Sequence, residues 1–375
     1  MCLRYGAITY IFDVADIAQL ALGEKHTMIL RTDGSVWTTA VSIEDFGSSS
    51  FLSKHFVRVI TCDAISVAAG KYHNIALMRD ASVWTTRKNP EGQLGPETIT
   101  NKGTFFFVKV VPGAKVVTAG GRHSLFITVN GRVWSTGWNK FGQLGDGSVL
   151  TRTNVVQVIS RGSKAVAVAA GDTHSIVARL DGSVWATGRN YHGQLGDRSK
   201  HDKQTFVKVI SKHAVNVAAN GDHSMVLMKD GSVWTVGCNE HGQLGDGSTT
   251  DRSTYVEVIP FGAKIVAAGS RHSMILKRDG SLWATGHNFY GQLGDGSTIN
   301  SNVFVKVILA GAKNVGAGAF HTVVIKQDGS VWATGSNQHG QFGDGSTVSQ
   351  TNFVKLTLFG NGAEYGTIAY TCVRR

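Results

Sequence analysis

The sequence has little proline, cysteine and charge. Of its 375 residues only 4 are Pro and 4 are Cys, whereas 46 are Gly, and charged residues make up 17%. Scarce proline with abundant glycine argues against a Pro/Gly/Ser-rich disordered chain and suits many tight turns between β-strands. The cysteines, Cys2, Cys62, Cys238 and Cys372, show no CxxC spacing. They are too few for a disulfide framework and fit a reducing compartment.

Long hydrophobic runs are also missing, so no transmembrane helix is predicted. The apolar stretch Ala7–Phe12 is followed closely by Asp13 and Asp16 and preceded by only one basic residue, Arg4. We do not interpret it as a secretory signal, and we expect an intracellular protein, cytoplasmic or nuclear. The net charge of +11 is dispersed, without a block of like charges. It therefore favours acidic partners but does not indicate a nucleic-acid-binding tail.

What the sequence does contain is a repeat. Seven times a histidine is followed after eleven residues by a tryptophan, and successive histidines lie 47, 50, 51, 49, 49 and 49 residues apart. The histidines are His26, His73, His123, His174, His223, His272 and His321. The tryptophans are Trp37, Trp84, Trp134, Trp185, Trp234, Trp283 and Trp332. A fixed period of this length is typical of a solenoid or a propeller.

One repeat holds four segments of strand length, separated by turn residues. In 166–210 the first three end at Gly171, Arg179 and Gly188, and the fourth is Phe206–Ile210. These short, mostly apolar segments do not alternate, which is typical of strands buried on both faces. Neither end shows a polar capping repeat, so an open solenoid is less favoured. We predict an all-β fold, a seven-bladed β-propeller of four-stranded antiparallel blades.

The prediction makes residues 1–375 a single propeller domain. Its repeats are expected at approximately 17–60, 61–111, 112–160, 161–210, 211–259, 260–308 and 309–358. Two similar segments, Tyr5–Tyr10 and Tyr365–Tyr370, lie outside these units. We expect 1–16 and 359–375 to supply terminal strands that close the ring, with linkage between copies as the alternative. Deleting 359–375 is then expected to lower the melting temperature sharply.

The turn between the second and third segments is Asp-Gly or Asn-Gly in six repeats, beginning at Asp33, Asn130, Asp181, Asp230, Asp279 and Asp328. Such dipeptides favour the type I′ hairpin, in which both central residues have positive φ. The second repeat has Asp80-Ala81 instead. Alanine at positive φ is strained by roughly 1 kcal/mol, so a different turn is predicted there.

Three linked motifs carry a family resemblance. They are A-A-G-x-x-H-[ST], D-G-S-V-W-x-T-G and N-x-x-G-Q-L-G-D-G-S, and the third recurs clearly from Asn139, Asn190, Asn239, Asn288 and Asn337. Over residues 17–358 the chain resembles the repeat family of the regulator of chromosome condensation. The resemblance implies a seven-bladed propeller that binds proteins. Two repeats depart from the pattern: repeat one lacks the Asn-x-x-Gly-Gln loop, and repeat two has Arg87 and Pro96 in place of the usual Gly and Asp.

The seven histidines and seven tryptophans are interpreted as structural. A residue needed in every blade performs a task that every blade has, such as bonding buried backbone or packing between blades. Metal sites need three or four ligands around one point, which a wide ring does not provide. The sequence nominates no catalytic residue, no metal site and no cofactor. A neighbouring His and Ser on one strand point to opposite faces, so they form no catalytic dyad.

Function is expected where the repeats disagree. Antiparallel strands place the turns before the histidines and the loops around the repeated Asn on one face. Positions there vary and are rich in aromatic and basic residues, which are enriched at interfaces. The predicted partner-binding residues are Lys71, Tyr72, Arg122, Trp138, Phe141, Arg189, Tyr191, His192, His241, Arg271, Phe289, Tyr290, Phe320 and His339.

The sequence therefore predicts a non-enzymatic protein-binding platform or a subunit of a larger assembly. One alternative, implied by the resemblance, is a guanine-nucleotide exchange factor for a small GTPase. Another is chromatin or nucleic-acid binding through lysines on the opposite face, Lys115, Lys164, Lys212, Lys264 and Lys313. Exposed, solvated lysines are the simpler interpretation of that set, so a nucleic-acid partner is less favoured. The identity of the protein partner and the oligomeric state are left open.

Overall fold

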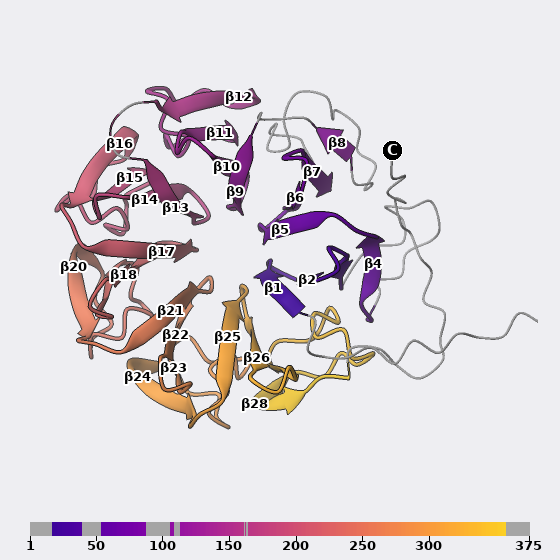
Figure 1. Ribbon diagram of the computed structural model, residues 1–375. Coiled ribbons are helices and arrows are strands. Elements are labelled where there is room, and N and C mark those ends of the chain that lie inside the picture. Colours follow the sequence, from indigo (N-terminus) through magenta and orange to yellow (C-terminus); the bar gives the residue numbers. More distant parts are fainter. Residues whose placement is uncertain are drawn as a thin grey trace, which may run out of the picture.

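The four-stranded units form a ring around a central axis (Figure 1). The computed structural model describes residues 17–39, 54–87, 106–108, 113–160, 162 and 164–357. Within them are seven antiparallel sheets of four strands each, in sequence order around the ring. The predicted fold class, a seven-bladed β-propeller, is confirmed. Each sheet is called a blade and is numbered along the chain.

The strands occupy the same place in every blade. The innermost strands are β1 (Ile17–Leu22), β5 (Ala64–Ala69), β9 (Ala114–Ala119), β13 (Ala165–Ala170), β17 (Ala214–Asn220), β21 (Ala263–Ala268) and β25 (Ala312–Ala317). The second strands are β2 (Thr27–Arg31), β6 (His73–Met78), β10 (His123–Thr128), β14 (His174–Arg179), β18 (His223–Met228), β22 (His272–Lys277) and β26 (His321–Lys326). The third strands are β3 (Val36–Thr38), β7 (Val83–Arg87), β11 (Val133–Gly137), β15 (Val184–Gly188), β19 (Val233–Gly237), β23 (Leu282–Gly286) and β27 (Val331–Gly335). The outer strands are β4 (Val57–Ile60), β8 (Phe106–Val108), β12 (Arg152–Ile159), β16 (Lys203–Ile210), β20 (Arg252–Ile259), β24 (Ser301–Ile308) and β28 (Gln350–Lys355).

The hydrophobic core lies between the blades. Every residue of the second strands β6 and β10 is buried. The buried side chains fall into seven clusters, and each cluster takes residues from two neighbouring blades. In one of them Met28 and Leu30 of blade 1 pack with Val67 and Ala76 of blade 2. Because each sheet is covered on both faces, its strands are apolar without alternation, as expected from the sequence.

The hairpin turns between second and third strands differ from the prediction. In blade 1 the Gly34 N–H donates to the Arg31 carbonyl (3.0 Å) and the Arg31 N–H donates to the Ser35 carbonyl (2.9 Å). Gly34 has φ +79°, but Asp33 is not among the residues with positive φ. This is a type I turn followed by a left-handed bulge residue, not type I′. The predicted turn type is wrong because the loop is one residue longer than the Asp-Gly pair.

The predicted exception in the second repeat is also wrong. The Ala81 N–H donates to the Met78 carbonyl (2.9 Å) and the Met78 N–H donates to the Ser82 carbonyl (2.8 Å). These are the bonds of the other blades, and Ala81 accepts φ +64° in order to make them. Packing between neighbouring blades imposes the common turn on a residue that disfavours it.

Replacing Ala81 with glycine is therefore expected to stabilise the protein. Relief of the left-handed strain raises the free energy of unfolding by about 1 kcal/mol. Chemical denaturation of the Ala81→Gly variant measures the change. The control is Ala167→Gly, in the ordinary strand conformation of β13, which is expected to be destabilising instead. Equal losses in both variants would contradict the strain at Ala81.

Blade 7 meets blade 1 directly, and this contact closes the ring. Ile17 and Phe56 share a core cluster with Val323 and Phe342. The Thr27 hydroxyl donates to the Gln341 carbonyl at 2.8 Å. Within the described residues each blade takes all four strands from one stretch of chain, so closure involves no exchanged strand. The predicted terminal strands, 1–16 and 359–375, lie outside the described residues, and their pairing stays a prediction.

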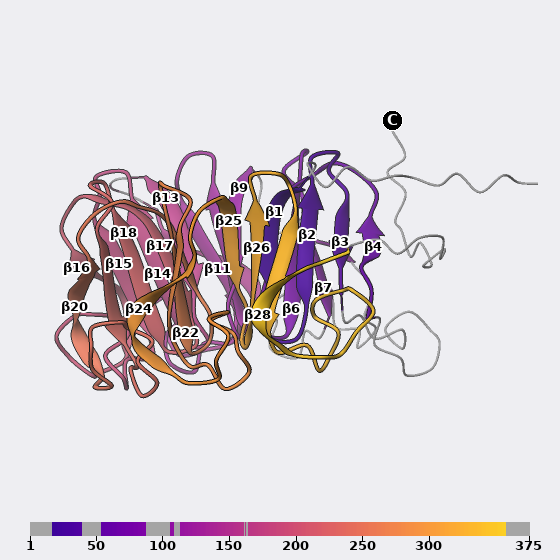
Figure 2. The same ribbon diagram turned by 90° about the horizontal axis from the view of Figure 1, so that it is seen from below.

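The two rims of the ring differ. Figure 2 shows long loops, between third and fourth strands, on one side of the disc and short turns on the other. In the part of the chain that the structure describes, no helix is long and apolar enough to span a bilayer. Cys62 and Cys238 are not joined to another cysteine by a disulfide. The side carrying the long loops and the turns before the histidines is called the loop face below.

Candidate functional site

The seven repeated histidines link each blade to the next. Their side chains are fully buried, and each Nε2 lies 2.5–3.1 Å from a side-chain oxygen on the second strand of the following blade. The partners, in chain order, are Asn74, Ser124, Ser175, Ser224, Ser273, Thr322 and Thr27. The last of these bonds, from His321 to Thr27, completes the circle.

The bonds also define the tautomer. The Ser175 hydroxyl donates to the Gln143 carbonyl at 2.7 Å, so it accepts from Nε2–H of His123 at 2.9 Å. Burial lowers the pKa of His123 to about 3, with the neighbouring His73 and His174 adding to the effect. The imidazole is neutral, and the serine proton is committed to a backbone carbonyl. These His–Ser contacts are therefore links between blades and not nucleophile–base pairs.

The seven repeated tryptophans lie half-buried on the third strands. In six blades the indole N–H donates to a serine hydroxyl two residues earlier, as from Trp332 to Ser330 at 2.8 Å. Basic side chains cover several rings, and Lys326 lies 3.7 Å from the centre of Trp332. Trp37, Trp84, Trp134 and Trp283 pack against the clusters between blades. In blade 3 Arg132 stands where the other blades have this serine, and the buried indole N–H of Trp134 has no hydrogen-bond partner.

A buried asparagine organises each long loop of blades 3 to 7. The Asn190 Nδ2 donates to Asp197 Oδ1 at 2.9 Å, and its Oδ1 accepts from the Leu195 N–H at 3.1 Å. The next glutamine adds a second clamp, because Gln194 Oε1 accepts from the His192 N–H at 3.0 Å. The bond to the Asn Oδ1 recurs at Asn139, Asn239, Asn288 and Asn337. The bond to the Asp recurs at the first three, whereas Asn337 donates to the Ser346 hydroxyl. The loops thus hold their variable residues on a rigid frame.

Eight of the predicted partner-binding residues meet in one continuous array across blades 2 to 4. Arg122 lies between the rings of Tyr72 (5.1 Å) and Trp138 (5.8 Å), and the Trp138 ring meets Phe141 edge-on at 5.4 Å. Arg189 then lies between Phe141 (5.1 Å) and Tyr191 (5.7 Å). The array is extended by Lys71 at Tyr72 and by His192 at Tyr191. We call it the first array.

Five further predicted residues meet across blades 5 to 7. They form a second array together with His287, which is not in the predicted set. The predicted members are His241, Arg271, Phe289, Tyr290 and Phe320. His287 is central, with ring centres 4.7 Å from His241 and 6.1 Å from Phe320. Burial lowers the pKa of His287 to about 4, helped by His241 and Arg271. The fourteenth predicted residue, His339, is half-buried, and no ring contact places it in either array among the described residues.

The central opening is lined by small residues and carries charge at its loop-face mouth. A cavity of about 240 Å³ runs along the innermost strands, past Ala69, Ala119 and Ala170. Lys71 Nζ lies 3.6 Å from Asp172 Oδ2 at its edge. Burial raises the pKa of Asp172, although Lys71 opposes the shift. The cavity therefore connects with the first array through an ion pair.

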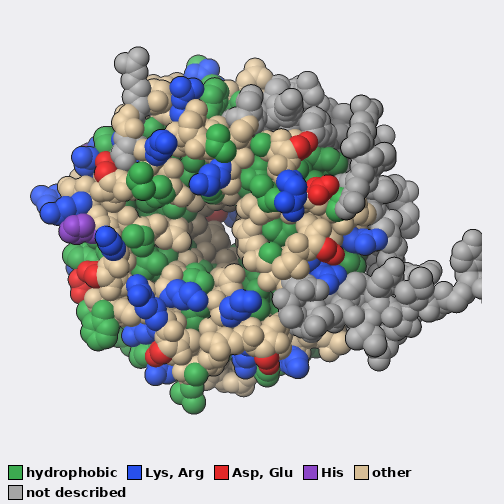
Figure 3. Space-filling view, in the orientation of Figure 1, with side chains coloured by type: hydrophobic (Ala, Val, Ile, Leu, Met, Phe, Trp, Pro, Cys, Tyr) green, Lys and Arg blue, Asp and Glu red, His purple; other side chains and the backbone are tan. Residues whose placement is uncertain are grey.

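The opposite face is basic. Figure 3 shows Lys and Arg side chains around the central opening on the side that carries the short turns. The five lysines predicted for this face, Lys115, Lys164, Lys212, Lys264 and Lys313, are all exposed. No aromatic array accompanies them among the described residues. They are well-separated solvated cations, a weaker candidate than the loop face.

Comparison with known proteins decides the family. Residues 100–365 match the family model described as the RCC1-like domain. The chain belongs to the RCC1-like domain family. No curated protein sequence matches it.

Solved structures share the RCC1-like fold of this chain. Human WBSCR16 has a TM-score of 0.74 at 21% identity, over 82% of this chain and 86% of that one. Yeast RCC1 (Prp20), solved with bound Kap60, has a TM-score of 0.71 at 22% identity, over 78% of this chain and 75% of that one. A second Prp20p structure, from Saccharomyces cerevisiae, has a TM-score of 0.70 at 24% identity, over 78% and 77%. At these identities the likeness shows the fold alone.

The predicted set of partner-binding residues for this RCC1-like propeller leaves out three residues on the loop face. His287, at the centre of the second array, stands directly before the repeated Asn288, where Trp138 precedes Asn139 in blade 3. That equivalence was the available signal. Cys238 and Asp251 lie beside His192 but do not belong to either array. Their proximity to His192 comes from a neighbouring blade, and no local pattern reports it.

Proposed function

We propose that this RCC1-like propeller binds a protein partner through the two arrays of its loop face. The observation that carries the proposal is the continuous series of rings and guanidinium groups in the first array. Each array exposes a large ring to solvent: Tyr191 in the first array is 65% exposed, and Phe289 in the second array is 67% exposed. Large rings held at the surface are unusual without a role, and Trp, Tyr and Arg dominate interface hot spots.

The arrays are also well prepared for binding. The clamps formed by Asn190 and Gln194 hold Tyr191 and His192 before any partner arrives, so little ordering entropy is lost on association. Arg122 and Arg189 present planar cations between rings. The chemistry fits a partner surface with carboxylates next to apolar side chains. We propose binding and not catalysis as the role, and the structural use of the histidine–hydroxyl pairs of the ring supports this proposal.

A solved relative supports the proposal at the level of the fold. Yeast RCC1 (Prp20) was crystallised with Kap60 bound, and a second Prp20p structure is described with its binding to Gsp1p and histones. These partners belong to the yeast protein. For this chain the partner is defined by its chemistry alone.

The test compares two matched sets of substitutions. One variant carries Arg122→Ala, Trp138→Ala, Tyr191→Ala and His241→Ala, all on the loop face. The control carries Lys115→Ala, Lys212→Ala, Lys264→Ala and Lys313→Ala on the opposite face. After equal melting temperatures have been verified, partners retained from native extract are compared with those of the wild type. We expect the loop-face variant to lose a specific partner, with at least a tenfold drop in affinity.

The lysine variant is expected to keep that partner. Retention of the same proteins by both variants would contradict the proposal. Loss only in the lysine variant would also contradict it and would move the binding surface to the opposite face. Binding through lysines to a phosphate polymer would further show a much steeper salt dependence than binding through rings and two arginines.

A further inference from the structure

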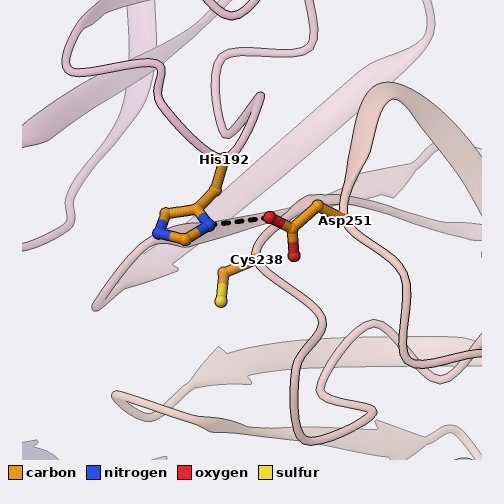
Figure 4. Close-up of side chains that lie close together, drawn as sticks. All are labelled: His192, Cys238 and Asp251. Atoms are coloured by element: carbon orange, nitrogen blue, oxygen red, sulfur yellow. Dashed lines mark hydrogen bonds and ion pairs between the residues drawn. The ribbon is translucent and has the colours of Figure 1, made fainter.

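Three side chains of metal-ligating type meet where blade 4 joins blade 5 (Figure 4). His192 comes from the long loop after β15, whereas Cys238 follows β19 and Asp251 precedes β20. Nδ1 of His192 lies 2.7 Å from Oδ2 of Asp251, and the three ligand atoms all lie within 4.8 Å of one another. Among the described residues this is the only such group.

The frame around the three side chains is rigid. Gln194 holds the backbone of His192, and the Asn239 N–H donates to Oδ1 of Asp251 at 2.8 Å. That bond leaves Oδ2 of Asp251 directed at His192. The side chains of His192 and Asp251 are 16% and 21% exposed, and Cys238 is buried. The group is therefore oriented by its surroundings and still reached by solvent from the loop face.

The repeats show that the fold does not require this combination. The residues in the place of Cys238 in other blades are Trp138, Arg189, His287 and Ser336. Those in the place of His192 are Phe141, His241, Tyr290 and His339. Those in the place of Asp251 are Asp202, Asn300 and Ser349, which accept the same backbone bond. An imidazole nitrogen, a thiol and a carboxylate therefore meet only at the junction of blades 4 and 5 among these equivalent positions. The neighbouring junctions have other side chains in the same three places.

We propose that His192 Nδ1, Cys238 Sγ and Asp251 Oδ2 bind one zinc ion, with the fourth position open towards the loop face. Mixed N, S and O ligands suit Zn²⁺, and three protein ligands with an open position are typical of sites that hold a water or an incoming group. The thiolate and the carboxylate together balance the charge of the ion. The site does not depend on the proposed partner, and it can exist without one.

The geometry needs only small movements. Zinc bonds of about 2.0–2.3 Å place tetrahedral ligands roughly 3.3–3.7 Å apart. The His192–Asp251 pair must open from 2.7 Å, and Cys238 must close from less than 4.8 Å. Side-chain rotation provides both. On binding, the thiol proton goes to solvent, and Nδ1 of His192 coordinates the metal with its lone pair while the ring proton is held on Nε2.

The test is a metal titration of the full chain, without an affinity tag, after treatment with a chelator. We expect one equivalent of Zn²⁺ to bind and to raise the melting temperature. Co²⁺ in its place is expected to give a near-ultraviolet thiolate-to-metal band. Cys238→Ser and His192→Ala are each expected to weaken Zn²⁺ binding by at least about 100-fold. Loss of the cobalt band in Cys238→Ser identifies the sulfur ligand.

Each variant has a matched control in the same chain. Cys62→Ser removes the other described cysteine thiol, and His241→Ala changes the position equivalent to His192 one blade further on. Both are expected to bind Zn²⁺ like the wild type. The proposal would be overturned if the wild type bound no stoichiometric Zn²⁺. It would also be overturned if the Cys238→Ser variant bound Zn²⁺ and Co²⁺ as tightly as the wild type. The melting curve of this variant without metal verifies that it is folded.

Discussion

Lowering the pH from 7.5 to 5.5 is expected to remove most of the stability of this RCC1-like propeller. The cause is a set of six fully buried histidines, His73, His123, His174, His223, His272 and His321. Burial, the largest cause, lowers the pKa from 6.5 to about 4 for His174 and to about 3 for the other five. As the pH falls, the unfolded chain therefore binds these protons first.

The direction and the window follow from that difference. The contribution of these histidines is complete above pH 6.5 and is lost as the pH falls from 6.5 towards 3. At pH 5.5 each one favours the unfolded state by roughly 1–2 kcal/mol, and six together by about 8 kcal/mol. A typical domain is stable by about 5–15 kcal/mol in total. Aspartates with lowered pKa, such as Asp246, act only below their ordinary value of 3.8 and do not contribute in this window.

The measurement is denaturant unfolding at pH 7.5, 6.5 and 5.5, followed by tryptophan fluorescence. We expect a loss of about 2 kcal/mol between the first two values and of about 6 kcal/mol between the last two. A His174→Gln variant is expected to lose about one sixth of the pH dependence, because one buried imidazole has been removed. Stabilities at pH 7.5 and 5.5 that agree within about 2 kcal/mol would show that the histidines are not buried as neutral links.

The second large effect is expected from a single methyl group at Gly171. This residue is not among those with positive φ, so its backbone conformation is open to alanine. Space is not available, because a Cβ there would overlap Cε1 and Nδ1 of the His174 ring and approach the Gly221 carbonyl to 2.8 Å. The ring has to move, and its bond to Ser224 in the next blade is broken. We expect Gly171→Ala to lower the free energy of unfolding by about 4 kcal/mol.

A different glycine separates lack of space from backbone strain. Gly262 has φ +85°, and nothing lies within 4 Å of a Cβ placed on it. The variant Gly262→Ala is expected to lose only about 1 kcal/mol. Chemical denaturation of the two variants gives the comparison. A loss at Gly171 as small as that at Gly262 would show that the histidine ring adapts without cost.

Blade 5 suggests how the loss at Gly171 can be reversed. There Asn220 stands in the place of the glycine, and it is tolerated because the following residue, Gly221, turns the chain with φ +50°. Asn220 pairs with His223 as an extension of β17. We therefore expect the double variant Gly171→Asn/Asp172→Gly to be more stable than Gly171→Ala. Failure of this rescue would mean that the turn of blade 5 depends on its neighbours.

The repeat explains why the sequence was so informative about the frame. A histidine that must reach the next blade, a glycine that must make room for it, and an asparagine that must hold a loop are needed in every blade, so they recur in register. The blade count and the strand segments follow from that recurrence. The hairpin at Asp33-Gly34 was predicted incorrectly because dipeptide preference does not reveal how many residues the loop includes. Ala81 adopts the common turn because packing between blades outweighs about 1 kcal/mol of local strain.

The loop face was predicted for a different reason. In a chain whose structural positions repeat, a position that varies is one that the blade structure does not constrain. Thirteen of the fourteen predicted binding residues lie in the two arrays. The order of contacts within them, such as Arg122 between Tyr72 and Trp138, was not predictable. Those contacts join loops of neighbouring blades, and their side-chain directions depend on the angle between blades.

By itself the sequence determined the ring, its seven blades, the buried histidines and the face that carries variable side chains. All of these follow from the features of one repeat and from the number of times it recurs along the chain. Only the tertiary structure decided which variable residues meet, as His192 meets Cys238 and Asp251 at distances of 46 and 59 residues along the chain. The physical reason is that each such contact joins two blades, and the distance between two blades is a property of the closed ring and not of any segment within it.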